Sequence, residues 1–217
     1  MIFFQKTDGS AEIQALLDKA RASDNMSVYR SGLVYEQLKA DFHGKCYLCE
    51  DDEPTSIQME HFEPHKDDLS KKYGWYNLFF SCGHCNNLKG ARFWPLLNCT
   101  AEVDRIWESI EIRFSAFPKP SVEIIAHPAA DKMKECDNTR LLLESTLAGK
   151  NTTSIKTDEA ANLRKKMLRA YNGLAIAIKN KDLEAVRNAV SNKAAFAGML
   201  RWTLKNEFPK IFATLLI

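Results

Sequence analysis

Two C-x2-C pairs constrain the fold of this chain more than any other feature of its sequence. The pairs are Cys46/Cys49 and Cys82/Cys85, and 32 residues lie between them. In each pair the short turn lets two thiolates approach one metal ion, and two such turns complete a tetrahedral site. Four thiolates leave no open coordination position, so the spacing predicts a structural Zn²⁺ ion and not a catalytic one. A redox-active C-x-x-C is the alternative, and the presence of two pairs favours zinc.

The composition is that of an ordinary globular protein. Of the 217 residues, 45% are hydrophobic and 27% are charged, which argues against wholesale disorder and fibrous repeats. No apolar run approaches the roughly 20 residues that a membrane-spanning helix needs, and the first six residues lack a signal-peptide pattern. We therefore expect a cytoplasmic protein with no membrane partner and no disulfide framework.

The small net charge of +2 hides an asymmetry along the chain. Residues 150–217 carry 13 Lys and Arg against 5 Asp and Glu, a charge of +8, whereas residues 1–149 carry a charge of −6. Such a split indicates either an anionic partner or a solvated helical surface. Lys165, Lys166 and Arg169 crowd one turn of a predicted helix and are candidates for binding nucleic acid or a partner protein.

Hydrophobic spacing predicts an α+β chain that is mainly α. Ser10 is placed to cap the first helix, and Asp182 is placed to cap one of the later ones. One predicted strand pair lies between the cysteine pairs, and the other flanks a Pro-Lys-Pro turn. The predicted helices cover residues 10–22, 27–42, 86–92, 138–147, 158–179, 182–191 and 192–207, and the predicted strands cover residues 56–62, 75–81, 110–114 and 121–126.

Between and just after the cysteine pairs lie four residues that a purely structural zinc ribbon does not need: Glu60, His61, Asn77 and Asn86. Hydrolysis of a phosphodiester requires a base to activate water and a divalent cation to stabilise charge on the phosphate. Histidine titrates near neutral pH, and carboxylate and amide oxygens suit Mg²⁺. The set predicts a metal-dependent nuclease; a non-catalytic zinc-ribbon adaptor for nucleic acid or protein is the alternative.

The stretch from residue 45 to about residue 94 resembles the HNH endonucleases. It carries C-x2-C, then Glu-His-x-x-Pro at residues 60–64, then Asn77 before an apolar Leu-Phe-Phe, and finally C-x2-C-N-x-x-K-G at residues 82–90. The resemblance implies a ββα-metal core, in which a strand pair precedes a helix, built beside the four-cysteine zinc ribbon.

The same resemblance implies a role for each of these four residues between and just after the cysteine pairs. His61 matches the general base, and Asn77 matches the asparagine that braces the loop and the base. Glu60 and Asn86 match the ligands of a catalytic Mg²⁺ or Mn²⁺, although the family more often has Asp or His at the position of Glu60. Lys89 and Arg92, on the predicted motif helix, are candidate phosphate contacts; a plain exposed helix face is the alternative.

Three phrases are similar to one HNH subgroup, the PtuB-like subunits encoded beside an ATPase in Septu and some retron anti-phage systems. They are Glu-His-Phe-x-Pro at residues 60–64, Trp-Tyr-Asn-Leu-Phe at residues 75–79 and Phe-Ala-Gly-Met-Leu-Arg at residues 196–201. This resemblance implies a partner ATPase docked on the C-terminal half, and either DNA or tRNA as substrate. The chain itself has no Walker-type phosphate loop. A restriction or homing nuclease acting alone is a third interpretation, but no recognition module is evident.

The sequence therefore predicts three segments. Residues 1–43 form an N-terminal helical segment, residues 44–97 form the zinc-stabilised HNH core, and residues 98–217 form a larger, mostly helical region. The excess of positive charge in the last segment assigns to it the contact with nucleic acid or with a partner.

Overall fold

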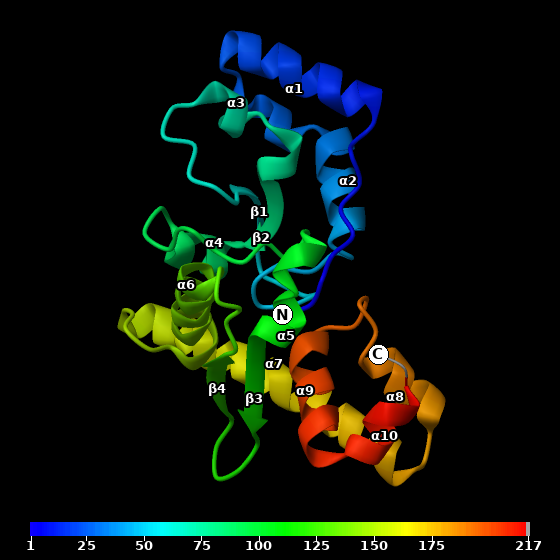
Figure 1. Cartoon of the computed structure of the whole chain (residues 1–217). Coiled ribbons are helices and arrows are strands. Elements are labelled where there is room, and N and C mark those ends of the chain that lie inside the picture. The colour runs from blue at the N-terminus through cyan, green and yellow to red at the C-terminus, as the bar shows by residue number, and fades with distance from the viewer. Residues whose placement is uncertain (216–217) are drawn as a thin grey trace.

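The computed structural model describes residues 1–215, and its first helix, α1 (Ala11–Ser23), lies at one end of the molecule (Figure 1). Ser10 caps the first helix because its side chain accepts a hydrogen bond from the Ile13 amide. The helix predicted over residues 27–42 is interrupted at Ser31, whose extended backbone and side chain start a new helix. These elements are α1 (Ala11–Ser23), the 3₁₀ helix η1 (Met26–Arg30) and α2 (Gly32–Asp41).

An antiparallel strand pair followed by a helix forms the centre of the molecule. Strand β1 (Ile57–His61) pairs with β2 (Leu78–Cys82), and α4 (Gly83–Lys89) follows β2 directly. The order strand, strand, helix is the one expected for a ββα core. Helix α4 starts inside the second C-x2-C pair, earlier than predicted, because the Cys82 side chain accepts the amide hydrogen of Cys85 and caps it.

The connection between β1 and β2 carries two short helical turns, α3 (Leu69–Lys72) and the 3₁₀ helix η2 (Trp75–Asn77). The second turn occupies the start of the strand predicted over residues 75–81, so β2 begins three residues later. The side chain of Asp68 accepts the amide hydrogens of Ser70 and Lys71 and caps α3. This connection is part of the site described below.

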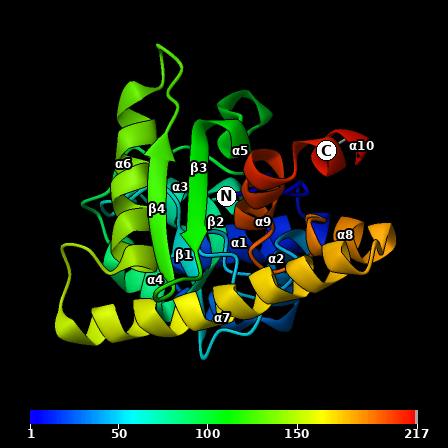
Figure 2. The ribbon, with the colours of Figure 1, turned by 90° about the horizontal axis from the view of Figure 1, so that it is seen from below.

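A second hairpin and a set of helices follow. The spacing predicts the hairpin and most of the helices, but not the short helices over residues 106–109 and 209–214. Strands β3 (Ile110–Ser115) and β4 (Ser121–Ala126) pair antiparallel, and the long helix α7 (Ser154–Lys179) crosses nearly the whole width of the molecule (Figure 2). Within residues 1–215, no helix is both long and apolar enough to cross a membrane. The remaining elements are η3 (Glu102–Asp104), α5 (Ile106–Ser109), α6 (Met133–Leu143), the π-helical turn η4 (Glu144–Ala148), α7 (Ser154–Lys179), α8 (Leu183–Ala189), α9 (Ala197–Glu207) and α10 (Pro209–Thr214).

Buried side chains from all three predicted segments belong to one hydrophobic cluster. Phe42 of the first segment packs against Phe79 of β2 with the rings tilted and 5.3 Å between their centroids. The same cluster includes Leu163 and Met167 of α7 and Leu200 of α9. The division after residues 43 and 97 thus stays a prediction, and residues 216 and 217 of the last predicted segment lie outside the described residues.

Candidate zinc centre and active site

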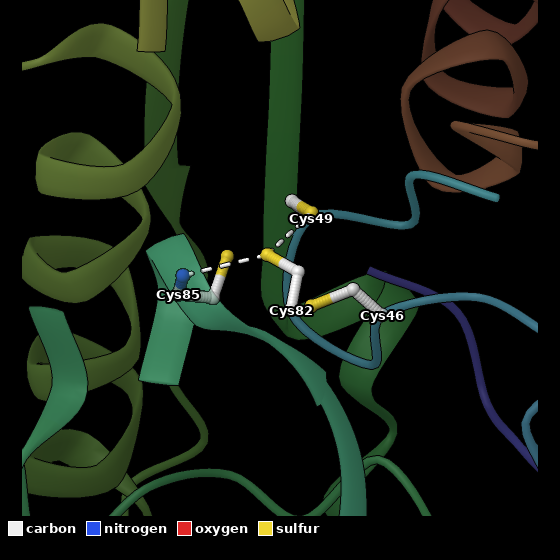
Figure 3. Close-up of side chains that lie close together, drawn as sticks. All are labelled: Cys46, Cys49, Cys82 and Cys85. Atoms are coloured by element: carbon white, nitrogen blue, oxygen red, sulfur yellow. Dashed lines mark hydrogen bonds between the residues drawn. The ribbon is translucent and has the colours of Figure 1, made fainter. Parts of the chain in front are cut away.

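The four predicted thiol ligands meet in one buried cluster (Figure 3). The Sγ atoms of Cys46, Cys49, Cys82 and Cys85 all lie within 4.8 Å of one another, and those of Cys49 and Cys82 are 3.9 Å apart. Zn–S bonds of about 2.3 Å in a tetrahedron separate the sulfurs by about 3.8 Å. The donor type and the spacing therefore fit a structural Zn²⁺, which would join the turn after α2 to the start of α4.

The first C-x2-C pair, Cys46/Cys49, is anchored to the C-terminal region by the residues on either side of it. Lys45, which precedes it, is fully buried and donates hydrogen bonds to the carbonyls of Asn192 and Ala194, each at 2.7 Å. Glu50, which follows it, accepts the amide hydrogen of Gly198 at 2.9 Å. A Cβ on Gly198 would lie 2.6 Å from Glu50 Oε1, so glycine allows this close approach. The phrase at residues 196–201 is thus largely buried against the zinc ribbon.

The second C-x2-C pair, Cys82/Cys85, is also anchored to the C-terminal region, through the ring of His84. Its Nε2 lies 2.9 Å from the carbonyl oxygen of Thr146, and its Nδ1 lies 2.5 Å from Glu159 Oε2 on α7. His84 is therefore no member of the ligand cluster. It is a tether between the zinc ribbon and the C-terminal helices.

His61 closes β1 with its ring held on one nitrogen. Nε2 lies 2.9 Å from the carbonyl oxygen of Lys72 and 3.2 Å from the hydroxyl of Tyr29. Since a carbonyl only accepts, Nε2 carries the hydrogen in the neutral ring and Nδ1 keeps its lone pair. No hydrogen bond from residues 1–215 reaches Nδ1, and burial lowers the pKa of His61, which favours the neutral form. The ring therefore has the protonation pattern of a base.

Asn77 ties the connection after His61 together from inside. Its Oδ1 accepts the amide hydrogen of Glu63 at 2.7 Å, and its Nδ2 donates to the carbonyls of Glu63 and Lys71, each at 3.0 Å. Its own carbonyl accepts the amide hydrogen of Phe62. The next carbonyl after Lys71 is the one that holds the His61 ring, so Asn77 fixes the backbone beside that acceptor.

Two side-chain contacts join β1 to α4 on the face opposite to His61. Asn86 Nδ2 donates to Gln58 Oε1 at 2.6 Å, and Lys89 Nζ lies 2.5 Å from Glu60 Oε1. Alternation along a strand places Gln58 and Glu60 on one face and His61 on the other. The structure thus brings Glu60 and Asn86 to the same layer, between β1 and α4.

Lys89 differs from its predicted place. The sequence predicts either a phosphate contact or a plain exposed helix face for this residue, but it is only 1% exposed. Its ammonium bonds to the His61 carbonyl at 2.9 Å as well as to Glu60. Lys89 lies at the end of the inner face of α4, so its long side chain folds back over β1. The lysine is a buried ion-pair partner and not a surface contact for nucleic acid.

A divalent cation would find two oxygen donors in this layer. Glu60 Oε2 is buried without a hydrogen bond, and no hydrogen bond from the described residues reaches Asn86 Oδ1. One carboxylate and one amide oxygen fit Mg²⁺ or Mn²⁺ in donor type, with water and phosphate completing the shell. Glu60 is the weaker candidate, because it is 4% exposed and already paired with Lys89. Burial raises the pKa of Glu60 to about 7 although the Lys89 ammonium opposes the shift.

The Glu60–Lys89 pair gives a first testable prediction. At a pH well above 7, where the Glu60 carboxyl is ionised, Glu60→Gln leaves the Lys89 ammonium buried without its countercharge, so we expect a loss of about 3–5 kcal/mol in the free energy of unfolding. The double variant Glu60→Gln/Lys89→Met removes both charges and should recover most of that stability. Urea unfolding of the zinc-loaded variants measures both effects. Equal stability of Glu60→Gln and the parent protein would show that the pair does not hold β1 to α4.

The predicted basic cluster on α7 separates into two kinds of residue. Lys166 is half-buried and bonds to both carboxylate oxygens of Asp51, at 2.7 and 2.9 Å, and to the carbonyl of Glu53. Lys165 and Arg169 are exposed, and within residues 1–215 neither forms an ion pair. Arg92 is also exposed and lies over the Phe93 ring at 4.5 Å. Lys166 is therefore a tether, and only the other three are open to an anionic partner.

Sequence reasoning missed Tyr29, Gln58 and the carbonyl of Lys72. Tyr29 lies 32 residues before His61, outside any motif, and a backbone carbonyl leaves no signature in side-chain identity. Strand alternation was the one available signal for Gln58, since it places this residue on the same face as Glu60. The ring of His65 also lies close to the site, with its centroid 4.8 Å from that of His61.

Comparison with known families matches the centre of the chain. Residues 46–92 match the family of HNH endonucleases. The HNH segment begins at the first cysteine of the zinc cluster and includes His61, Asn77 and Asn86, which indicates a nuclease. No curated protein matches the chain. The HNH match covers well under half of the sequence, so the account of residues 1–45 and 93–215 comes from the structure alone.

Proposed function

We propose that this protein is a metal-dependent endonuclease that hydrolyses phosphodiester bonds, with His61 as its general base. The observation that carries the proposal is the state of the His61 ring: Nε2 is held by the Lys72 carbonyl, and Nδ1 is left with a free lone pair. A base in this state can take a proton from an attacking water molecule, which is worth a factor of about 10²–10⁴ in rate. The HNH match over residues 46–92 supports the same conclusion.

The other predicted residues have distinct tasks in this proposal. Asn77 holds the connection that carries the Lys72 carbonyl, so it keeps His61 oriented. Asn86 Oδ1 and Glu60 Oε2 are the proposed ligands of Mg²⁺ or Mn²⁺. When bound, such an ion stabilises negative charge on the phosphate and the leaving oxygen. The four cysteines hold structural zinc and take no part in the chemistry.

The finer proposal is that the nuclease works in an anti-phage complex with a partner ATPase. Its support is the resemblance of the phrases at residues 60–64, 75–79 and 196–201 to the PtuB-like subunits. Because residues 196–200 are buried against the zinc ribbon, an ATPase docked on the C-terminal region would have to use other surfaces of residues 98–217. The proposal includes the cytoplasm as location, where the reducing environment keeps thiolates available to zinc.

The exposed cations of α7 are the proposed grip on nucleic acid. Charge reversal at both Lys165 and Arg169 should weaken binding and lower the slope of log K against log salt by about two, because each lost phosphate contact removes about 0.9. Lys166→Glu is the matched control: it breaks the contact with Asp51, so it should lower stability and leave the slope nearly unchanged. Fluorescence anisotropy at several salt concentrations measures the slopes. Unchanged slopes in the double variant, with loss of binding to a purified ATPase, would assign these residues to the protein partner.

The substrate is tested by one cleavage assay on two nucleic acids. Zinc-loaded protein is incubated with duplex DNA or with tRNA in Mn²⁺ or Mg²⁺, with and without the proposed partner ATPase. We expect duplex DNA to be cut, and cutting of tRNA alone would reassign the substrate. If neither nucleic acid is cut in any combination while zinc is bound, the chain is a zinc-ribbon adaptor and the proposal is wrong.

A further inference from the structure

Tyr29 touches the base from outside the segment that matches the HNH family. It belongs to η1, and its ring stacks on Tyr73 with 5.8 Å between the centroids. The same ring meets the His61 ring edge-on at 5.6 Å. The Tyr29 hydroxyl donates a hydrogen bond to the Lys72 carbonyl and lies 3.2 Å from His61 Nε2. Three polar atoms of Tyr29, His61 and Lys72 therefore form a closed triangle.

The donors in this triangle can be assigned from simple valence. Burial raises the pKa of Tyr29 well above its usual range, so the hydroxyl keeps its one hydrogen. That hydrogen is directed at the Lys72 carbonyl, which leaves the hydroxyl oxygen free to accept. The hydrogen on His61 Nε2 therefore faces two acceptors, the carbonyl at 2.9 Å and the hydroxyl at 3.2 Å.

The N-terminal segment also fixes the position of the Lys72 carbonyl. Asp24, just after α1, accepts hydrogen bonds from the Lys72 ammonium at 2.7 Å and from the Tyr73 hydroxyl at 2.8 Å. The end of α3 is thus attached to residues 24 and 29 of the first segment. The acceptor that holds the His61 ring is anchored to helices that precede the HNH segment.

We propose that Tyr29 is a positioning residue for His61, which fixes the tautomer of the ring and the placement of the Lys72 carbonyl. The N-terminal helical segment then completes the active site of the HNH segment. The expected effect on rate rests on the proposed function, whereas the effect on the ring is a property of the resting protein and needs no substrate.

Tyr29→Phe tests the proposal, since it keeps the stacked ring and removes only the hydroxyl. Tyr35→Phe is the matched control: Tyr35 lies in α2 and packs on Phe80 at 5.6 Å, and no hydrogen bond from the described residues reaches its hydroxyl. In ¹⁵N spectra of histidine-labelled, zinc-loaded protein with the ring neutral, the parent should show a protonated Nε2 and a bare Nδ1. His61→Gln identifies the signals.

We expect Tyr29→Phe to bring the two ¹⁵N shifts of His61 closer together, as partial mixing of tautomers requires, and Tyr35→Phe to leave them unchanged. In the cleavage assay kcat should fall about tenfold with KM unchanged, less than the whole worth of a general base. Unchanged shifts in Tyr29→Phe, or an equal fall of kcat in Tyr35→Phe, would overturn the proposal. If the shifts move but His61→Ala still cleaves, positioning stands and the proposed function falls.

Discussion

Replacing Cys49 by alanine should release the zinc ion and unfold the centre of the molecule. The structure brings four buried sulfurs together at the spacing of a tetrahedral zinc site, and binding of such an ion contributes about 10–16 kcal/mol of folding free energy. A loss of even about 5 kcal/mol lowers the melting temperature of a chain of this length by about 10–20 °C. Metal analysis by mass spectrometry and a thermal melt of the same preparation measure both effects.

Cys99→Ala is the matched control for that experiment. Cys99 is as deeply buried as the zinc ligands, but it is not part of the four-sulfur cluster. Removing its thiol should leave only a small cavity, which lowers the free energy of unfolding by about 1 kcal/mol. The zinc content should equal that of the parent protein. A stable, zinc-free Cys49→Ala protein with the melting temperature of Cys99→Ala would show that zinc does not hold this fold.

Replacing His61 by alanine should abolish cleavage while the protein stays folded. Removal of a general base lowers the rate by about 10²–10⁴. The His61 side chain is only half-buried and belongs to neither the zinc cluster nor the Glu60–Lys89 pair. We therefore expect unchanged zinc content, a nearly unchanged melting temperature and unchanged affinity for nucleic acid. Rates under single-turnover conditions separate the chemical step from binding.

His65→Ala is the control for position in that experiment. The two imidazole rings are 4.8 Å apart, so any general effect of losing a histidine at this edge should appear in both variants. We expect His65→Ala to keep most of the activity, because in the structure His65 Nδ1 accepts the Asp67 amide hydrogen and serves the local turn. Equal losses of cleavage activity in the two variants would show that His61 has no special role.

The motif residues were predictable from sequence because their order and spacing express local structure. Two C-x2-C pairs indicate the four-cysteine cluster and the helix that carries Asn86. One alternating segment between the pairs indicates the strand that ends at His61. The errors in the predicted helix boundaries also have local causes. Ser31 splits a predicted helix because its side chain caps a new one, and Cys82 starts α4 early for the same reason.

The environment of the motif was not predictable, because contacts distant in sequence decide it. Lys89 and Lys166 looked like surface cations, and each is instead bound to a carboxylate, 29 and 115 residues away in the chain respectively. A charge run in the sequence does not show which members find a partner. Tyr29 reaches His61 across 32 residues through a 3₁₀ turn, and no spacing rule connects the two.

The central claim is that His61 performs metal-dependent cleavage of a phosphodiester, and cutting itself tests it most directly. Zinc-loaded parent and His61→Ala proteins are incubated side by side with duplex DNA and tRNA in Mn²⁺, with the proposed partner ATPase present and absent, and once with EDTA. The account predicts cut products from the parent in Mn²⁺, and none in EDTA or from His61→Ala. Cleavage by His61→Ala at the rate of the parent would contradict it.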